Sequence, residues 1–292
     1  MEAYTSLSRR QASSPKGTGL RPPFRDPLWS SVTPEFVIVV PYRDRPQQLA
    51  EFEINMRAVL ANIDPATYRI WYMHPCDGRP FNRGAMKNLG FHVLRDVYPH
   101  TYSQITLVFH DIDTVPTGPD VIPDYRTRPG VVKHFYGYTH ALGGIVSIRA
   151  GDFERINGFP NYWAWGYEDN MLQTRVMKAP NMSIDRSTFY VINDAVHIRQ
   201  DRGGRTRTVN RGEFDRYMRM DPEGINTIRG VVYDAPRPIS MGGLGHRVDV
   251  RAFDTGKECN TNLNTDFDAA RGQAPFTVGR SARMRSRMNL VM

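Results

Sequence analysis

The chain has 292 residues, of which 40% are hydrophobic and 23% are charged, and its formal net charge is +8. That length can bury one large core or two small ones. The excess charge lies at the ends, because residues 1–26 carry five Lys or Arg against two acids and residues 271–292 carry five Arg against none. Residues 27–270 carry 28 basic and 28 acidic side chains, and this balance excludes a domain that binds nucleic acid along a whole basic face.

Cysteine content and hydropathy indicate the compartment. Two cysteines, Cys76 and Cys259, cannot form a disulfide framework, which favours a reducing environment. No apolar run reaches the roughly 18 residues of a membrane span, and the N-terminus lacks the apolar core of a signal peptide. We therefore expect a soluble, intracellular protein.

The first half of the chain alternates between strand and helix patterns. Residues 1–34 are rich in Ser, Pro, Arg and Gly, which predicts an N-terminal arm. The following segments read as strands at 36–40, 68–73 and 104–109, separated by helices at 46–62 and 81–96. This alternation predicts an α/β fold with a mostly parallel central sheet flanked by helices.

The second half has shorter signals. Strands are predicted at 131–135, 143–148 and 190–192, with helices at 152–156 and 169–177. The Gly/Arg-rich segment 199–207 is typical of a mobile lid. We expect three regions: the arm (1–34), one catalytic-type domain (35–255) and a basic C-terminal tail (256–292).

Two carboxylates follow the third strand, at the edge where open α/β sheets bind ligands. Asp111 and Asp113 flank Ile112, and a capped turn is the alternative explanation for them. A divalent cation that holds a diphosphate needs such oxygen ligands, and Asp194 and His197 could complete the set with Asp113. The imidazole favours Mn²⁺ over Mg²⁺, although for His197 alone a structural role is slightly favoured.

The densest cluster of candidate residues lies in the stretch 156–170, INGFPNYWAWGYEDN. It places Trp163, Trp165 and Tyr167 beside the carboxylates of Glu168 and Asp169. Aromatic planes next to ionisable carboxylates, introduced by turn residues, are typical of a sugar-sized pocket with a general base.

These residues resemble the β-1,4-galactosyltransferase family, which are inverting enzymes of the Rossmann-like GT-A fold that use a UDP-sugar and Mn²⁺. The likeness covers roughly 36–253 and is most specific in the block 156–169. It runs in order through VVPYRDR at 39–45, FNR at 81–83, DID at 111–113, the glycine pair 143–144, His197, FDR at 214–216 and GINTI at 224–228.

The resemblance assigns roles to these positions. Asp169 would be the catalytic base, Glu168 would orient the sugar or the base, and Trp165 would cover the donor. The implied metal ligands are Asp113, Asp194 and His197. The implied donor and nucleotide residues are Pro41, Tyr42, Arg43, Arg45, Phe81, Arg83, Ile112, Asp113, Ala141 and Gly144. The implied acceptor residues are Tyr138, Tyr167, Asn170, Phe214 and Tyr217.

Several positions depart from the family pattern. Asp194 replaces a Met or His ligand, which makes Mg²⁺ a candidate beside Mn²⁺. Ala141 replaces a tyrosine that narrows the donor pocket, so either UDP-Gal or UDP-GalNAc is expected as donor. Tyr167, Asn170 and Glu213 change the acceptor side, so the acceptor is expected only as a glycan or glycoprotein hydroxyl.

The family's disulfide cysteines and Golgi anchor have no counterparts here, which predicts a cytoplasmic or virion-associated protein of a microbe or large virus. One alternative is an enzyme closer to chondroitin polymerases or polypeptide GalNAc transferases, which share a similar acidic block. The other is a GT-A fold without catalysis that serves as a structural component, with its basic termini docking to acidic partners.

Overall fold

The computed structural model describes residues 32–201, 206–258, 260–268 and 275–276. The predicted arm therefore lies almost entirely outside the described residues, as do Cys259 and most of 269–292. The strands are β1 (Phe36–Pro41), β2 (Tyr68–Pro75), β3 (Thr106–His110), β4 (Thr114–Pro116), β5 (Val131–Gly137), β6 (Ile145–Arg149), β7 (Ser183–Asp185), β8 (Tyr190–Val191), β9 (Ile198–Gln200), β10 (Thr206–Asn210), β11 (Arg229–Tyr233), β12 (Arg237–Pro238), β13 (His246–Asp254) and β14 (Asn264–Asp268). The helices are α2 (Pro46–Val59), α3 (Arg83–Val97), α4 (Ala150–Arg155), α5 (Glu168–Lys178) and α6 (Arg211–Met218), with short 3₁₀ turns η1 (Pro65–Thr67), η2 (Tyr102–Gln104), η3 (Ile225–Thr227) and η4 (Thr261–Leu263).

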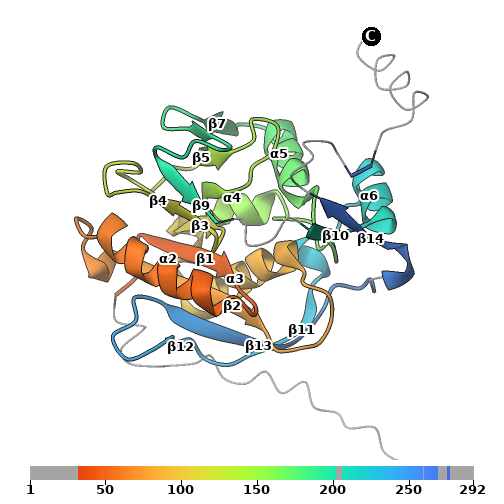
Figure 1. The fold of residues 1–292 in the computed structure, drawn as a ribbon, viewed down its shortest axis with the longest axis horizontal. Coiled ribbons are helices and arrows are strands. Elements are labelled where there is room, and N and C mark those ends of the chain that lie inside the picture. The colour runs from red at the N-terminus through yellow and green to blue at the C-terminus, as the bar shows by residue number, and fades with distance from the viewer. Residues whose placement is uncertain (1–31, 202–205, 259, 269–274, 277–292) are drawn as a thin grey trace, which may run out of the picture.

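Strand β1 lies at the centre of the core, and all six of its residues are buried. Successive side chains of a strand point to opposite faces of its sheet. Val37 and Val39 accordingly join the hydrophobic cluster that contains α3, whereas Ile38 and Val40 join the cluster that contains Phe52 of α2. The two helices therefore cover opposite faces of the sheet (Figure 1), which explains why β1 reads as an uninterrupted apolar run.

The main sheet is mixed, with the strand order β11-β13-β2-β1-β3-β6-β5-β7. Strands β13, β2, β1 and β3 run parallel to one another, and β6 pairs antiparallel with both β3 and β5. The carboxyl ends of β1 and β3 consequently meet at one edge. The polar residues that follow these strands are brought together there, as the sequence pattern predicts.

Two small sheets lie beside the main one. Strand β4 pairs with β9, and β10 pairs with β14. Strands β10 and β14 lie with α6 at one end of the fold (Figure 1). Regular structure thus continues past the predicted boundary at 255, because β14 finds its partner more than 50 residues earlier in the chain.

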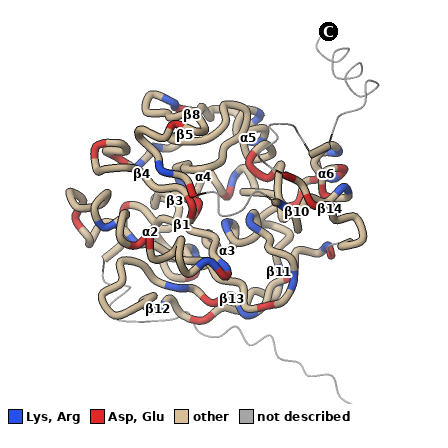
Figure 2. The backbone as a smooth tube through the Cα atoms, in the orientation of Figure 1, with Lys and Arg blue, Asp and Glu red and all other residues tan. Residues whose placement is uncertain are grey.

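The predicted lid at 199–207 begins in β9 and ends in β10, and its residues 202–205 lie outside the described part of the chain. Along the described backbone, basic and acidic positions are interspersed (Figure 2), in agreement with the balanced charge of the central region. No helix among the described residues is long and apolar enough to cross a membrane.

Candidate functional site

Arg83, the first residue of α3, connects three carboxylates at the edge of the sheet. Its Nη2 donates to both oxygens of Asp111, at 2.7 and 2.8 Å. Its Nη1 donates to Oε1 of Glu168 at 2.6 Å and to Oδ2 of Asp169 at 2.9 Å. The guanidinium therefore fixes the end of β3 against the start of α5 with charge-assisted bonds. Although burial lowers the pKa of Arg83, the three carboxylates raise it well above its usual value.

Lys87, one turn further along α3, is the second cation of this cluster. Its side chain is 1% exposed, and Nζ lies 3.3 Å from Oδ1 of Asp169 and 4.0 Å from Oδ1 of Asp111. The ring of Phe159 lies 4.5 Å below the ammonium group. Burial lowers the pKa of Lys87, with a further decrease from the charge of Arg83. This lysine was not predicted from the sequence, because α3 reads there as an ordinary amphipathic helix.

The pKa values of the two neighbouring acids shift in opposite directions. Burial raises the pKa of Asp111, but Arg83 and Lys87 outweigh that effect and lower it. For Glu168 burial dominates and its pKa is raised. Three carboxylates share two cations here, so the cluster is short of one positive charge.

Asp169 is fixed from its other side by the backbone of the 142–144 segment. The backbone N–H of Leu142 donates to the carbonyl of Asp169 at 3.0 Å. A Cβ on Gly143 would overlap the Asp169 carboxylate, so only glycine allows this close approach. Gly144, the predicted donor residue, has a positive φ of 71°, and a Cβ there would collide with the carbonyl of Tyr136.

The residues after β1 surround the same edge. Arg45 Nη1 lies 3.3 Å from Oδ2 of Asp113, and the guanidinium of Arg43 lies 5.1 Å from the centre of the Phe81 ring. Tyr42 is largely buried, with its ring beside His74. Pro41 ends β1, and Ile112 is buried between the two acids of its motif. The structure therefore gathers the predicted nucleotide residues, whereas the guanidinium of Arg83 is already occupied by carboxylates.

The aromatic stretch turns sharply before α5. Tyr167 precedes the helix with a φ of 71°, a left-handed conformation that is uncommon for a residue with a side chain. Its ring packs on Tyr217 at 4.9 Å and on Phe214 at 5.0 Å between centroids. Three predicted acceptor residues thus form one aromatic wall. Trp165, which is 42% exposed, lies on the same stretch.

The other predicted acceptor residues lie on the loop after β5. Tyr138 is 52% exposed, and its ring lies 5.2 Å from that of His140. Asn170 donates from Nδ2 to the carbonyl of His140 at 3.2 Å, which ties α5 to this loop. Ala141 is buried on the same loop. Glu213 is also buried and pairs with Arg216, so its carboxylate is committed within the protein.

The predicted metal ligands are not gathered at one point. His197 Nδ1 lies 3.1 Å from Oδ1 of Asp194, so those two side chains do meet. The backbone carbonyl of Asp113, however, accepts from the N–H of Asp201 at one end of the β4–β9 ladder, and the carbonyl of His197 accepts from the N–H of Thr117 at its other end. Four residues along a strand separate their backbones by roughly 13 Å. Among the described residues, the ligand atoms of Asp113, Asp194 and His197 do not all lie within 4.8 Å of one another, so as placed they do not hold a single ion.

One other trio among the described residues has the donor types of a metal centre. His74, Cys76 and Asp249 present ligand atoms within 4.8 Å of one another. Two arginines occupy the carboxylate, because Arg247 Nε lies 2.6 Å from one Asp249 oxygen and Arg237 contacts the other. Guanidinium groups repel a cation at that distance. We therefore interpret this trio as part of an ion-pair network that joins β13 to β2.

Comparison with known proteins identifies the family. A model of the N-terminal region of glycosyl transferase group 7 matches residues 22–122, and a model of the N-terminal domain of galactosyltransferase matches residues 131–201. Together they cover more than half of the chain. The chain belongs to the β-1,4-galactosyltransferase family.

Individual galactosyltransferases match over part of their length. Drosophila melanogaster β-1,4-galactosyltransferase 7 is 29% identical over 184 residues, which are 57% of this chain and 55% of that protein. Mouse β-1,4-galactosyltransferase 1 is 30% identical over 217 residues, 68% of this chain and 51% of the relative. The xylosylprotein 4-β-galactosyltransferase of Caenorhabditis elegans is 32% identical over 149 residues, 48% of this chain and 49% of that protein. The chain thus spans about half the length of these galactosyltransferases.

Solved galactosyltransferase structures share the fold. A mutant of the Drosophila galactosyltransferase 7, in complex with manganese, UDP-Gal and xylobiose, superposes with a TM-score of 0.58 at 20% identity. It matches 79% of this chain and 97% of that chain. The catalytic domain of the same fly enzyme in complex with xylobiose gives a TM-score of 0.56 at 22% identity. The predicted GT-A fold is confirmed by these likenesses.

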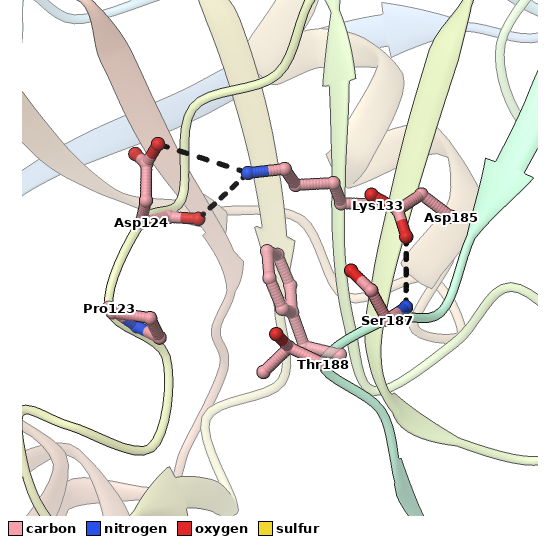
Figure 3. A pocket seen from close by; sticks show the side chains of 7 residues that line it. Pro123, Asp124, Lys133, Asp185, Ser187 and Thr188 are labelled. Carbon is pink, nitrogen blue, oxygen red and sulfur yellow. Dashed lines mark hydrogen bonds and ion pairs between the residues drawn. The ribbon is translucent and has the colours of Figure 1, made fainter.

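A further pocket lies away from the galactosyltransferase-like edge, between β5 and the segment after β7 (Figure 3). Lys133 crosses it to reach Asp124, and Asp185 accepts a bond from the backbone of Ser187. Its volume of about 60 Å³ holds about two water molecules. It is therefore too small for a sugar nucleotide.

Proposed function

We propose that this chain is a metal-dependent, inverting glycosyltransferase that moves galactose or N-acetylgalactosamine from a UDP-sugar to a hydroxyl group of a glycan or glycoprotein. The observation that carries the proposal is the placement of Asp169. Its carboxylate lies at the start of α5, between Arg83, Lys87 and Gly143, at the edge where β1 and β3 end. Family membership supports a galactosyltransferase chemistry at this position.

In the proposed reaction, Asp169 accepts the proton of the acceptor hydroxyl. The acceptor oxygen then forms a bond to the anomeric carbon from the face opposite UDP. The bond between that carbon and the diphosphate oxygen breaks, and UDP leaves with the electron pair. Arg83 and Lys87 orient Asp169 for this step, since both cations contact its carboxylate.

We propose that the diphosphate and nucleotide bind on the donor side, defined as the residues after β1 and β3 with Phe81, Ala141 and Gly144. The acceptor side comprises the wall of Tyr167, Phe214 and Tyr217, with Tyr138 and Asn170. The resemblance implies that Trp165 covers the donor, and because it lies on the same stretch as Tyr167 we propose that it also contacts the acceptor. Manganese bound to the Drosophila relative supports metal dependence. Asp113 lies apart from Asp194 and His197, so these three residues as placed do not hold one ion together. The carboxylate of Asp194, in place of a Met or His ligand, makes Mg²⁺ a candidate beside Mn²⁺.

Ala141 supports N-acetylgalactosamine as a second donor sugar. Alanine is much smaller than the tyrosine that the resemblance places at this position, so we propose that this site accepts a 2-acetamido group that the larger side chain would exclude. The xylobiose in the Drosophila structures supports a glycan acceptor. A cytoplasmic or virion-associated location, and docking of the basic termini to acidic partners, remain predictions that cell fractionation and terminal deletion can test.

The proposal is tested by calorimetric titration of UDP with and without Mn²⁺, followed by a transfer assay. We expect Mn²⁺-dependent UDP binding by the native protein, and weaker binding by Asp113→Asn. Asp169→Asn should still bind UDP, while its transfer rate falls about 10²- to 10⁴-fold. Absence of UDP binding by the native protein, or full transfer by Asp169→Asn, would contradict the proposal.

A further inference from the structure

The C-terminal segment beyond β13 is tied to the acceptor side by backbone pairing. Strand β14 forms a five-residue antiparallel ladder with β10, in which Phe267 pairs with Arg207. The side chain of Asn210 donates to the carbonyl of Asn260 at 2.9 Å and to Oδ1 of Asn264 at 2.7 Å. These bonds fix residues 260–268 beside the start of α6. Neither family model reaches this segment, since the second one ends at residue 201.

The segment after β13 contacts both Trp163 and Trp165 of the aromatic stretch before α5. The Trp165 ring stacks on Phe267 with 6.1 Å between centroids and 19° between planes. The backbone N–H of Trp165 donates to the carbonyl of Thr208, on the strand that β14 pairs with, at 2.9 Å. Two residues earlier, Nε1 of Trp163 donates to the carbonyl of Lys257 at 2.8 Å. The stretch before Asp169 is thus held from β10, β14 and the turn after β13.

A second aromatic ring extends the contact to the rest of the wall. Phe276 packs on Phe214 with 5.1 Å between centroids, and Phe214 packs on Tyr167. Phe267 therefore supports Trp165, and Phe276 supports the wall through Phe214. Trp165 keeps 42% of its surface exposed, so part of its indole remains available to a ligand.

We propose that Phe267 is a positioning residue for acceptor recognition, which holds the Trp165 indole as a platform for the apolar face of an acceptor sugar ring. This inference rests on the proposed function and adds that the acceptor wall depends on the C-terminal segment. The residue acts through Trp165. Phe276 supports Phe214 in the same way, so the chain selects its acceptor with a segment that the matched family models do not contain.

The test compares Phe267→Ala with Phe267→Tyr and with Leu263→Ala, a partly exposed apolar residue of the same segment. Kinetics use the acceptor that the native protein prefers from an oligosaccharide panel that includes xylobiose. An aromatic pair contributes enough that Phe267→Ala should raise the KM for acceptor about two- to tenfold. The KM for UDP-sugar should stay unchanged. Phe267→Tyr should restore the acceptor KM, and Leu263→Ala should match the native protein.

Fluorescence gives a readout that needs no turnover. Acrylamide quenching of tryptophan should increase in Phe267→Ala, and this increase should disappear in a Trp165→Phe background. An acceptor KM that is unchanged in Phe267→Ala, or one that rises equally in Leu263→Ala, would overturn the inference while the transfer activity stands. A native protein that fails to bind UDP would overturn the proposed function, and the inference with it, whatever the quenching shows.

Discussion

Most donor-side residues come from the ends of β1 and β3 and the start of α3, all within residues 41–113, whereas the acceptor side is assembled from residues between 138 and 276. Parallel pairing of β1 and β3 is sufficient to bring the first set together. The second set needs the turn before α5, helix α6 and the β10–β14 ladder. The donor side is thus a property of the central sheet, while the acceptor side depends on long-range contacts near the C-terminus.

This difference indicates where the family can vary. A change in the segment after β13 can reshape the acceptor wall without altering the sheet edge, because Phe267 stacks on Trp165 while Phe276 packs on Phe214 and Arg211. A change at the sheet edge affects residues packed on both faces of β1. We therefore expect donor binding to tolerate C-terminal changes, and three further substitutions probe that separation.

The largest effect is expected from Arg83→Met, because Arg83 joins the two sides. It bonds to Asp111 at the end of β3 and to Glu168 and Asp169 at the start of α5. Removing it leaves three carboxylates with one buried cation, which should lower the free energy of unfolding by roughly 3–5 kcal/mol. Misplacement of Asp169 should lower transfer by about 10²-fold or more. Chemical denaturation and initial rates measure both quantities.

Arg126→Met is the matched control, since Arg126 forms an exposed pair with Glu35 and its loss should cost less than about 1 kcal/mol. If Arg83→Met does not fold, Arg83→Lys keeps the charge without the bidentate geometry and should still transfer slowly. Native stability and activity in Arg83→Met would show that the two sides are not joined through this residue.

A smaller effect is expected from Ala141→Tyr, which separates donor selection from acceptor selection. The larger side chain should fill the space that we assign to a 2-acetamido group. The ratio of kcat/KM values for UDP-GalNAc and UDP-Gal should therefore fall about tenfold or more. Phe267→Ala should leave that ratio unchanged. Strict use of UDP-Gal by the native protein, unaffected by Ala141→Tyr, would contradict the donor proposal.

Local patterns were sufficient to predict the sheet edge. The strands at 36–40, 68–73 and 104–109 and the two helices between them are confirmed within a few residues, since a buried parallel strand has an unambiguous apolar run. The fold follows from that alternation, and the family likeness in the block 156–169 predicts Asp169 as the base. These features depend on contiguous residues.

Features that depend on distant partners were not predicted. Strand β14 has the sequence NTDFD, which carries no strand signal and exists because β10 pairs with it. The pairing of β4 with β9 separates Asp113 from His197, which spacing alone could not indicate. Lys87 faces the carboxylates only because α3 packs on β1 and β2. In each case a tertiary contact decides the role of the residue.

The smallest effect is expected from Lys87→Met, which removes one of the two buried cations and leaves Arg83 to face Asp111, Glu168 and Asp169 alone. Burial raises the pKa of Glu168, and Lys87 counteracts part of that rise. Without the lysine the pKa of Glu168 should rise further, because one of the two cations that favour its charged form is gone. The acid limb of the pH–rate profile should then move to higher pH.

The pH dependence of stability tests the direction of this change in the pKa of Glu168 independently of activity. When a carboxyl group has a higher pKa in the folded than in the unfolded state, the folded protein loses stability as the pH rises from the unfolded-state pKa through the folded-state pKa. The melting temperature of Lys87→Met should therefore fall further below that of the native protein at pH 8 than at pH 5. Lys133→Met is the control, because Lys133 pairs with Asp124 far from Asp169. An equal decrease in melting temperature at both pH values would show that Lys87 only fills space beside Phe159. Asp169 would then be oriented by Arg83 alone.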